Sequence, residues 1–244
     1  MKKTKKSFNL NERKSGILSN LIIGVLIISV GFVCIYPFND EVTAGKLDKD
    51  VYRKGIGNGV SLMFNVYSGT EYVLDILSTL EEYEAKATFF IGGCWADDNV
   101  DCLKKISEQG HEIGNHGYFH KDHTSLSKEK NVQEIKLCNE FVKQAIGIDV
   151  TLFAPPSGAY NSVVVESAKS LNMSTVMWSK DTIDWRDKNP SLIYTRATNK
   201  VEAGDLILMH PTEHTAAALE DILRYYKSCN LSLITVSENL QVGG

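Results

Sequence analysis

The sequence lacks the short motifs of two common classes of hydrolase. It contains no His-Glu-x-x-His segment, which is the zinc-binding helix motif of one large class of metalloproteases. It also contains no Gly-x-Ser-x-Gly segment, the sharp turn that presents a nucleophilic serine. Ser157-Gly158 follows two prolines without the first glycine that such a turn requires. These absences exclude both classes, so any hydrolytic site must be built from other residues.

Cysteine is scarce as well, with five residues in 244, and their spacing matches no metal-binding motif. Cys34 lies within a long apolar run, which leaves Cys94, Cys102, Cys138 and Cys229 in the rest of the chain. Export of that part would permit disulfides. Cys94 and Cys102 are the pair nearest in sequence, and the connectivity stays open.

Charge is distributed unevenly along the chain. Residues 1–16 carry six of the 26 lysines and arginines and a single acidic residue, Glu12, whereas residues 17–38 carry no charge at all. From residue 17 onward the chain therefore has 20 basic and 29 acidic groups, a net charge of −9. Because an acidic surface repels phosphate groups, we expect no nucleic-acid partner.

The uncharged stretch is long enough to cross a bilayer as a helix, and basic residues precede it. This arrangement predicts a cytoplasmic N-terminus and a domain outside the cytoplasm, in a single-pass protein of the cytoplasmic membrane. We therefore divide the chain into a basic head (1–16), a transmembrane signal anchor (17–38), a polar stalk (39–58) and one globular domain (59–244). Cleavage after the small residues 42–44, which would release a secreted domain, is the alternative.

Apolar strand-like runs and amphipathic helical patterns alternate through the globular domain. The strand-like runs include Val60–Val66, Ala87–Ile91, His111–Asn115 and Leu206–Met209. Repeated strand–helix units of this length predict an α/β fold with a parallel sheet, closed into a barrel. The candidate functional residues follow the carboxyl ends of these strands, which is where such barrels assemble their sites.

One ten-residue stretch, His111 to His120, contains the most informative pair of side chains. His116 and His120 are separated by three residues, a spacing at which two imidazoles can hold one metal ion from one side. A complete metal site needs a third ligand. Two histidines in a solvated loop are the alternative interpretation.

Five segments resemble, in the right order, the motifs of the polysaccharide deacetylase family (NodB homology, carbohydrate esterase family 4). They are Ala87–Gly92, Gly114–Asp122, Phe153–Gly158, Asp181–Trp185 and Leu206–His210, and together they cover about Gly59 to Leu240. The family's first motif, T-F-D-D-G, appears here in an altered form as Met63–Tyr67. The resemblance implies a NodB-type distorted (β/α) barrel with a mainly parallel sheet. It also implies deacetylation of N-acetylated amino sugars, with cell-wall peptidoglycan or another N-acetylated polysaccharide as the partner.

The resemblance also implies roles for individual residues. A divalent metal, commonly zinc, would be held by His116 and His120, with His210 as the general acid and Asp181 orienting it. The position of the general base holds Asn65. The residues implied to line the substrate groove are Tyr67, Pro155, Pro156, Trp185 and Leu208.

The first motif departs from the family at its two acidic positions. Asn65 cannot accept a proton as a carboxylate does, and Val66 stands where the family has its metal-binding aspartate. Ala154 also replaces an arginine that partners the base in the family. Sporulation-type members of the family likewise have irregular first motifs.

Two hypotheses follow from these losses. In the first, a substitute ligand completes the metal site and hydrolysis continues. The candidates are Glu71, Asp122 and Asp184 as oxygen donors and His123 as a spare nitrogen. In the second, the domain binds glycan without cutting it, and aromatic rings stack against the sugars. The aromatic candidates are Tyr67, Tyr118, Trp178 and Trp185.

Overall fold

The computed structural model describes residues 50–242. The predicted head, the predicted membrane span and the first part of the predicted stalk lie outside the described residues. Within residues 50–242, none of the helices has both the length and the apolar character that a membrane crossing requires.

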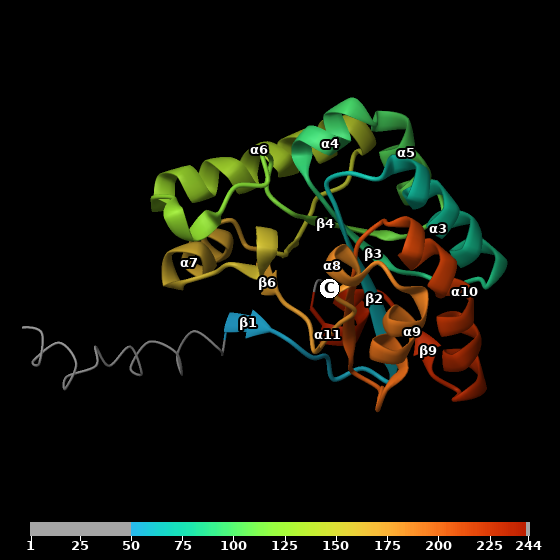
Figure 1. The fold of residues 1–244 in the computed structure, drawn as a ribbon. Helices are drawn as coiled ribbons and strands as arrows, with labels where there is room; N and C mark the ends of the chain where they lie inside the picture. Colours follow the sequence, from blue (N-terminus) through green and yellow to red (C-terminus); the bar gives the residue numbers. More distant parts are fainter. Residues whose placement is uncertain (1–49, 243–244) are drawn as a thin grey trace, which may run out of the picture. The chain divides into compact units, whose positions relative to one another are not determined.

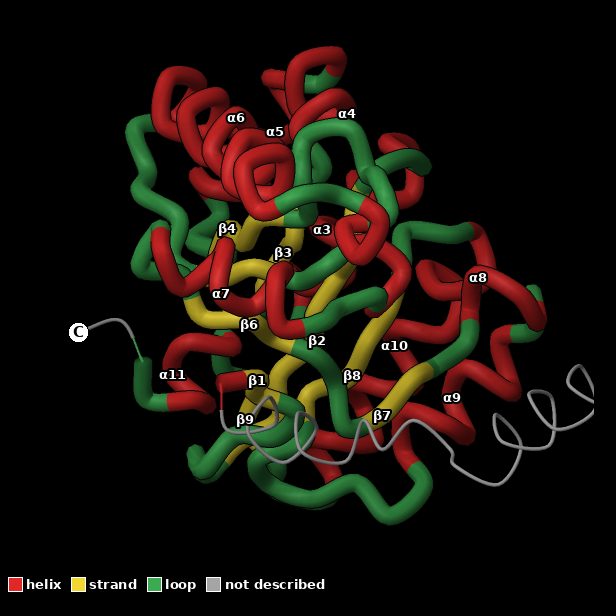
Figure 2. The backbone as a smooth tube through the Cα atoms, turned by 90° about the vertical axis from the view of Figure 1, so that its left-hand side faces the viewer, coloured by secondary structure: helices red, strands yellow, loops and turns green. Residues whose placement is uncertain are grey.

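Within residues 50–242, nine strands form one sheet, and all pairs between them are parallel. The order across the sheet is β1-β6-β5-β4-β3-β2-β8-β7, and β9 pairs with the start of β2 (Figure 2). The strands are β1 (Val51–Tyr52), β2 (Gly59–Val66), β3 (Thr88–Ile91), β4 (Glu112–Asn115), β5 (Leu152–Phe153), β6 (Ser174–Val176), β7 (Lys180–Asp181), β8 (Leu206–Met209) and β9 (Ser232–Leu233). The predicted parallel α/β sheet is confirmed.

The helices connect these strands and flank the sheet (Figure 1). They are α3 (Thr70–Glu82), α4 (Gly93–Asp98), α5 (Val100–Glu108), α6 (Lys128–Ile146), α7 (Ser162–Ser170), α8 (Asp184–Asp187), α9 (Pro190–Thr198), α10 (Glu213–Ser228) and α11 (Val236–Leu240), with the short 3-10 turns η2 (His123–Ser125) and η3 (Pro156–Gly158). Two helix ends follow the expected local chemistry. At the start of α7 the Asn161 side chain accepts a hydrogen bond from the Val164 amide, and α6 ends at Gly147 with a φ of 75°.

The alternation of side chains along β2 separates the core from the functional face of the sheet. Phe64 and Val66 are fully buried in a large apolar cluster that also contains side chains of α3, α5, α6, α7, α9 and α10. Met63 points the other way, into a second cluster with residues of α11. Because successive side chains of a strand point to opposite faces, Asn65 lies on the same face as Met63.

The predicted closure into a barrel is not found among the described strands. β1 and β7 form the two edges of the sheet, and no pairing joins them within residues 50–242. The sheet is therefore an open, curved part of a barrel. β7 has only two residues before the chain turns into α8, and β1 pairs with β6 over two residues. The chain after β1 meets the other end of the sheet through an isolated antiparallel bridge between Lys54 and Asp205.

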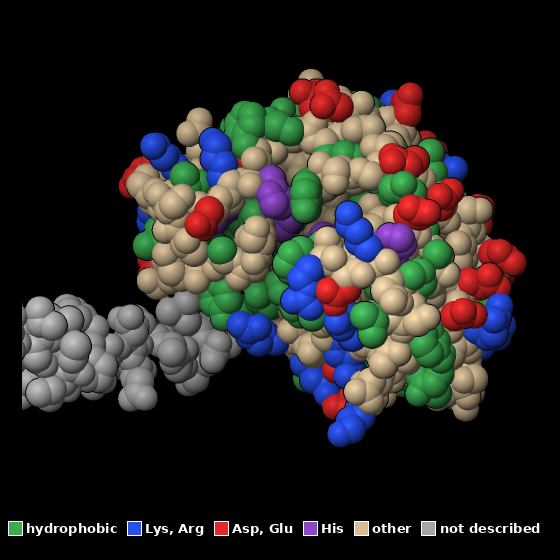
Figure 3. All heavy atoms as spheres, in the orientation of Figure 1, with side chains coloured by type: hydrophobic (Ala, Val, Ile, Leu, Met, Phe, Trp, Pro, Cys, Tyr) green, Lys and Arg blue, Asp and Glu red, His purple; other side chains and the backbone are tan. Residues whose placement is uncertain are grey.

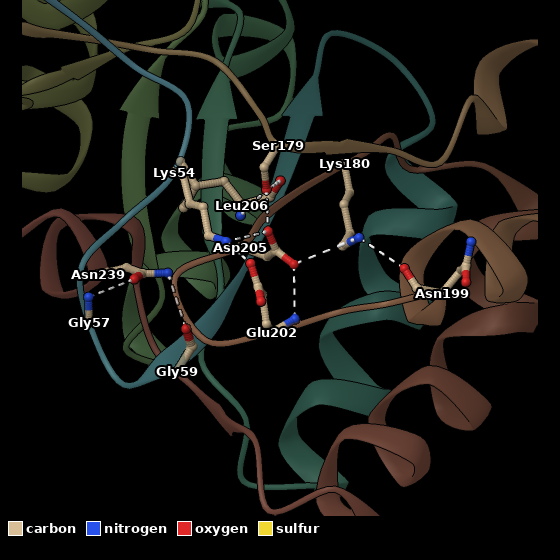
Figure 4. Close-up of polar contacts among 10 residues, drawn as sticks. All are labelled: Lys54, Gly57, Gly59, Ser179, Lys180, Asn199, Glu202, Asp205, Leu206 and Asn239. Atoms are coloured by element: carbon tan, nitrogen blue, oxygen red, sulfur yellow. Dashed lines mark hydrogen bonds and ion pairs between the residues drawn. The ribbon is translucent and has the colours of Figure 1, made fainter.

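The described part of the predicted stalk belongs to the domain. Val51–Tyr52 forms β1, and the Gly55 amide donates to the Gly204 carbonyl at 2.7 Å. A buried carboxylate, Asp205, holds the same segment through an ion pair with Lys54 (Figure 4). The Asn239 side chain accepts from the amide of Gly57, also drawn in Figure 4. Residues 50–58 are therefore part of the domain, and their polar groups bond to it.

The four cysteines of the described residues are free. Cys94 lies in α4, while Cys102 is buried in α5, and the Asn99 junction between these helices separates them. α4 ends at Asp98, and α5 begins at Val100. Cys138 is fully buried in α6 and donates its thiol proton to the Ile91 carbonyl at 3.2 Å.

His111, the residue before β4, is expected to make the stability of the fold depend on pH. Its Nδ1 accepts a hydrogen bond from the Ala87 amide at 3.3 Å, and burial lowers the pKa of the ring to about 4. Between pH 6.5 and 4 the unfolded chain therefore binds a proton that the native ring does not, so stability falls as pH falls. From pH 7 to pH 5 we expect this group to cost about 1–2 kcal/mol of unfolding free energy.

Urea unfolding at the two pH values measures this effect. His111→Gln should reduce the pH dependence, because the amide oxygen still accepts from Ala87 but does not titrate. His214→Gln on α10 is the control for loss of a histidine elsewhere. An unchanged pH dependence in His111→Gln would contradict the assignment.

Candidate functional site

A pocket of about 330 Å³ lies beyond the carboxyl ends of the strands, as the sequence predicted for the functional side chains. It receives side chains from the ends of β2, β4, β7 and β8 and from the loops after β5 and β6. Its lining residues are Asn65, Tyr67, His116, His120, Ser157, Gly158, Trp178, Asp181, Trp185, Leu208 and His210. Figure 3 shows histidine side chains beside hydrophobic ones where this face is hollowed.

His116 follows β4 and is almost completely buried. Its Nδ1 donates to the carbonyl of Ala154 at 2.7 Å, because a carbonyl oxygen only accepts hydrogen bonds. The hydrogen bond fixes the tautomer, so that Nε2 carries the free lone pair. Burial is the main cause that lowers the pKa of His116 to about 3, and the ring is therefore neutral near pH 7.

His120 lies on a loop whose backbone is strained at that residue. Its φ is 51°, in the left-handed region that side chains other than glycine rarely adopt. The ring packs against Tyr67 with 4.0 Å between centroids and lies 5.0 Å from the His116 ring. Burial lowers the pKa of His120 as well. The two predicted imidazoles are thus brought together in one pocket.

A buried carboxylate that the sequence did not reveal holds the His120 loop. Glu134 of α6 accepts the Phe119 amide at 2.9 Å and the Lys121 ammonium at 2.7 Å. The two residues that flank His120 are therefore bound to the two oxygens of one carboxylate. The sequence did contain one sign of this buried carboxylate. Glu134 lies beside Ile135 in the apolar stripe of an amphipathic helix, where an acidic side chain is rarely buried without partners.

Asp184, and not Asp181, orients His210. The Asp184 carboxylate is fully buried and accepts His210 Nδ1 at 2.8 Å and the His210 amide at 2.6 Å. It also accepts the Thr215 hydroxyl at 2.7 Å and the Trp185 amide at 2.9 Å. Asp181 instead lines the pocket, where its carboxylate accepts the Ile183 amide at 2.8 Å. The predicted role of Asp181 is therefore wrong, and the left-handed turn at Ile183 is the physical reason, because it directs Asp184 inward.

The candidates for a third metal ligand are not placed beside the two imidazoles. Glu71 is exposed in the first turn of α3. The side chain of Asp122 caps η2 by accepting the Thr124 amide at 2.9 Å, and Asp184 is fully engaged with His210 and its neighbours. Within residues 50–242, no group of three or more histidine, cysteine or acidic side chains is arranged to hold a metal ion.

His123, the candidate spare nitrogen, lies behind the pocket. It is fully buried beside the Phe153 ring, and a Cβ on Gly117 would lie 2.9 Å from its Nε2. Gly117 also has a φ of 73°, so glycine is required there for both reasons. With only two imidazoles in place and no anionic partner, the described residues do not fit a three-ligand metal site.

The predicted groove residues divide into two groups. Tyr67, Trp185 and Leu208 line the pocket, and so does Trp178. Pro155 and Pro156 are buried, and the residues that follow them, Ser157 and Gly158, form that wall instead. Tyr118 packs against the core cluster and does not line the pocket.

Comparisons with known proteins agree with this geometry. The sequence model described as polysaccharide deacetylase matches residues 53–176. The chain is 42% identical over 179 residues to the uncharacterized protein YlxY of Bacillus subtilis, covering 73% of this chain and just over half, 56%, of that protein. It is 32% identical over 192 residues to a peptidoglycan-N-acetylglucosamine deacetylase of Bacillus cereus, covering 75% of this chain and 88% of that enzyme.

A solved structure is similar over most of the domain. It is BA3943, described as a CE4 family pseudoenzyme from Bacillus anthracis, with 33% identity and a TM-score of 0.75 over 78% of this chain and 68% of that one. A mutant of the same protein is described as having restored enzymatic activity. With its parallel sheet, its pocket at the strand ends and these matches, the chain belongs to the polysaccharide deacetylase family.

Proposed function

We propose that the domain binds amino-sugar glycan of the cell wall in this pocket without hydrolysing it. The observation that carries the proposal is Asn65. It is buried at the position of the general base, where an amide cannot take a proton, and within residues 50–242 no acidic side chain is arranged to hold a metal ion together with His116 and His120. Relatives named as peptidoglycan deacetylases support the class of ligand. The pseudoenzyme named among the similar structures supports the loss of turnover.

The aromatic side chains of the pocket provide the contacts that a sugar ring needs. Tyr67 and Trp185 are 44% and 56% exposed although both are large apolar residues, and both line the pocket. An exposed ring face beside polar groups packs against the C–H face of a pyranose while the sugar hydroxyls bond to those polar groups. The free protein leaves these faces available to a ligand.

Titration calorimetry with chitooligosaccharides and soluble peptidoglycan fragments tests this function. Trp185→Ala should weaken binding at least tenfold, about 1.4 kcal/mol, because it removes an exposed aromatic contact. Leu192→Ala is the matched control, since Leu192 is 42% exposed on α9 and does not line the pocket. Binding that survives Trp185→Ala unchanged, or acetate release by the unchanged chain, would contradict the proposal.

Metal-assisted deacetylation is the second candidate, and one observation favours it. His116 Nε2 is free, and the Asp184–His210 pair is intact, so both a metal-binding imidazole and a general acid are available. A divalent metal such as zinc would supply the electrophile and the activated water of that reaction. Zinc bound in a one-to-one ratio together with acetate release from peptidoglycan would favour this candidate over binding alone.

We further propose that the domain is tethered to the outer face of the cytoplasmic membrane. The support is the lysine-rich head before an uncharged stretch of 22 residues, 17–38. Protease added to intact protoplasts should then digest the domain, whereas a cytoplasmic marker protein stays intact. Protection of the domain would contradict this orientation, and recovery of the domain from the medium would favour cleavage after residues 42–44.

A further inference from the structure

His116 presents a hydrogen-bond acceptor to the pocket. His116 and His210 each donate through Nδ1, to the Ala154 carbonyl and to the Asp184 carboxylate. Burial lowers the pKa of His116, so its ring is neutral and Nε2 is the acceptor. The lone pair of His116 is therefore available to a ligand that donates hydrogen bonds.

The carboxylate of Asp181 has the same polarity. Asp181 contributes the only carboxylate among the eleven lining residues, and none of the eleven is a lysine or arginine.

The aromatic side chains of the pocket also favour a positively charged ligand. Tyr67, Trp178 and Trp185 line the pocket, and the faces of aromatic rings carry negative charge density. A cation within about 6 Å of such a face is attracted to it. The pocket thus combines a carboxylate, an imidazole lone pair and aromatic faces, with no lysine or arginine among its described lining residues.

We propose that the pocket selects amino sugars whose nitrogen is free, so that the domain recognises deacetylated glycan in preference to N-acetylated glycan. This inference rests on the proposed glycan binding. The ammonium group of a glucosamine unit offers three donors and a positive charge to the Asp181 carboxylate and to His116 Nε2. An N-acetyl group offers a single N–H donor and adds a carbonyl oxygen, an acceptor that faces other acceptors.

The test compares two oligosaccharides of equal length, the tetramer of glucosamine and the tetramer of N-acetylglucosamine. Calorimetric titrations at pH 6 and about 0.15 M salt use protein freed of metal by a chelator, because salt screens attraction to the acidic surface. We expect the glucosamine tetramer to bind at least tenfold more tightly. Asp181→Asn should reduce this preference to less than threefold, since the amide keeps the cap on Ile183 but removes the charge.

One control variant separates the pocket from general attraction. Asp101→Asn removes an exposed carboxylate on α5, outside the pocket, and should leave the preference unchanged. Equal or tighter binding of the acetylated tetramer overturns the inference but not the proposed function. A preference that Asp101→Asn reduces as much as Asp181→Asn overturns the inference too. Failure of both tetramers to bind overturns the proposed function itself.

Discussion

The double variant Asn65→Asp, Val66→Asp is expected to release acetate from N-acetylated chitooligosaccharides in the presence of zinc, whereas the unchanged chain is not. Asn65→Asp places a carboxylate base on the pocket face of β2. Val66→Asp adds an anionic oxygen at the position where the family holds its metal-binding aspartate, at the end of the same strand. His116, His120 and the Asp184–His210 pair are already in place.

The same variant should show a large change in stability. Val66 is the last residue of β2 and is fully buried, so a carboxylate there costs about 2–4 kcal/mol of unfolding free energy when no cation neutralises it. Zinc that binds the new carboxylate with the imidazoles stabilises the native state by mass action. Thermal unfolding with zinc and with chelator measures the difference.

Three variants control this experiment. Asn65→Asp alone should give neither acetate release nor a zinc-dependent rise in stability, and adding His120→Ala to the double variant should remove both. His210→Asn in the double variant should reduce acetate release while zinc still stabilises the protein. Stabilisation by zinc without any acetate release would show that the two acidic positions are not the only losses.

Asp184→Asn is expected to lower the unfolding free energy by about 2–4 kcal/mol and to displace His210. The carboxylate accepts four hydrogen bonds, whereas an amide accepts through one oxygen only and directs its own N–H groups at the remaining donors. Each buried donor left without an acceptor costs about 1–3 kcal/mol. Chemical denaturation measures the loss of stability, and the imidazole resonances of His210 report its displacement.

Thr215→Val is the matched control for that variant. It removes one of the four donors to Asp184 and nearly conserves the volume, so it should cost about 1 kcal/mol and leave His210 in place. If Asp184→Asn cost no more than Thr215→Val, the carboxylate would not be the group that holds this end of β8.

The sequence alone determined the order of the elements and the position of the histidines. Hydrophobic periodicity is a local property, and β8 was predicted with its observed bounds while β2, β3 and β4 were predicted to within one residue. His116, His120 and His210 follow the ends of strands, and parallel strands bring those ends to one edge of a sheet. The resemblance in five segments pointed to the family to which the chain belongs.

Only the tertiary structure decided which polar groups meet. Asp181 and Asp184 are three residues apart in one motif, and the left-handed backbone at Ile183 turns the second one, not the first, toward His210. Glu134 holds the His120 loop from a helix that begins after the loop, a contact that local periodicity does not encode. Whether the strands close into a barrel depends on the lengths of the two edge strands and on what they pair with. Pairings between distant segments follow from the packing of the whole chain, because the side chains that satisfy a buried donor or acceptor come from wherever the fold brings them.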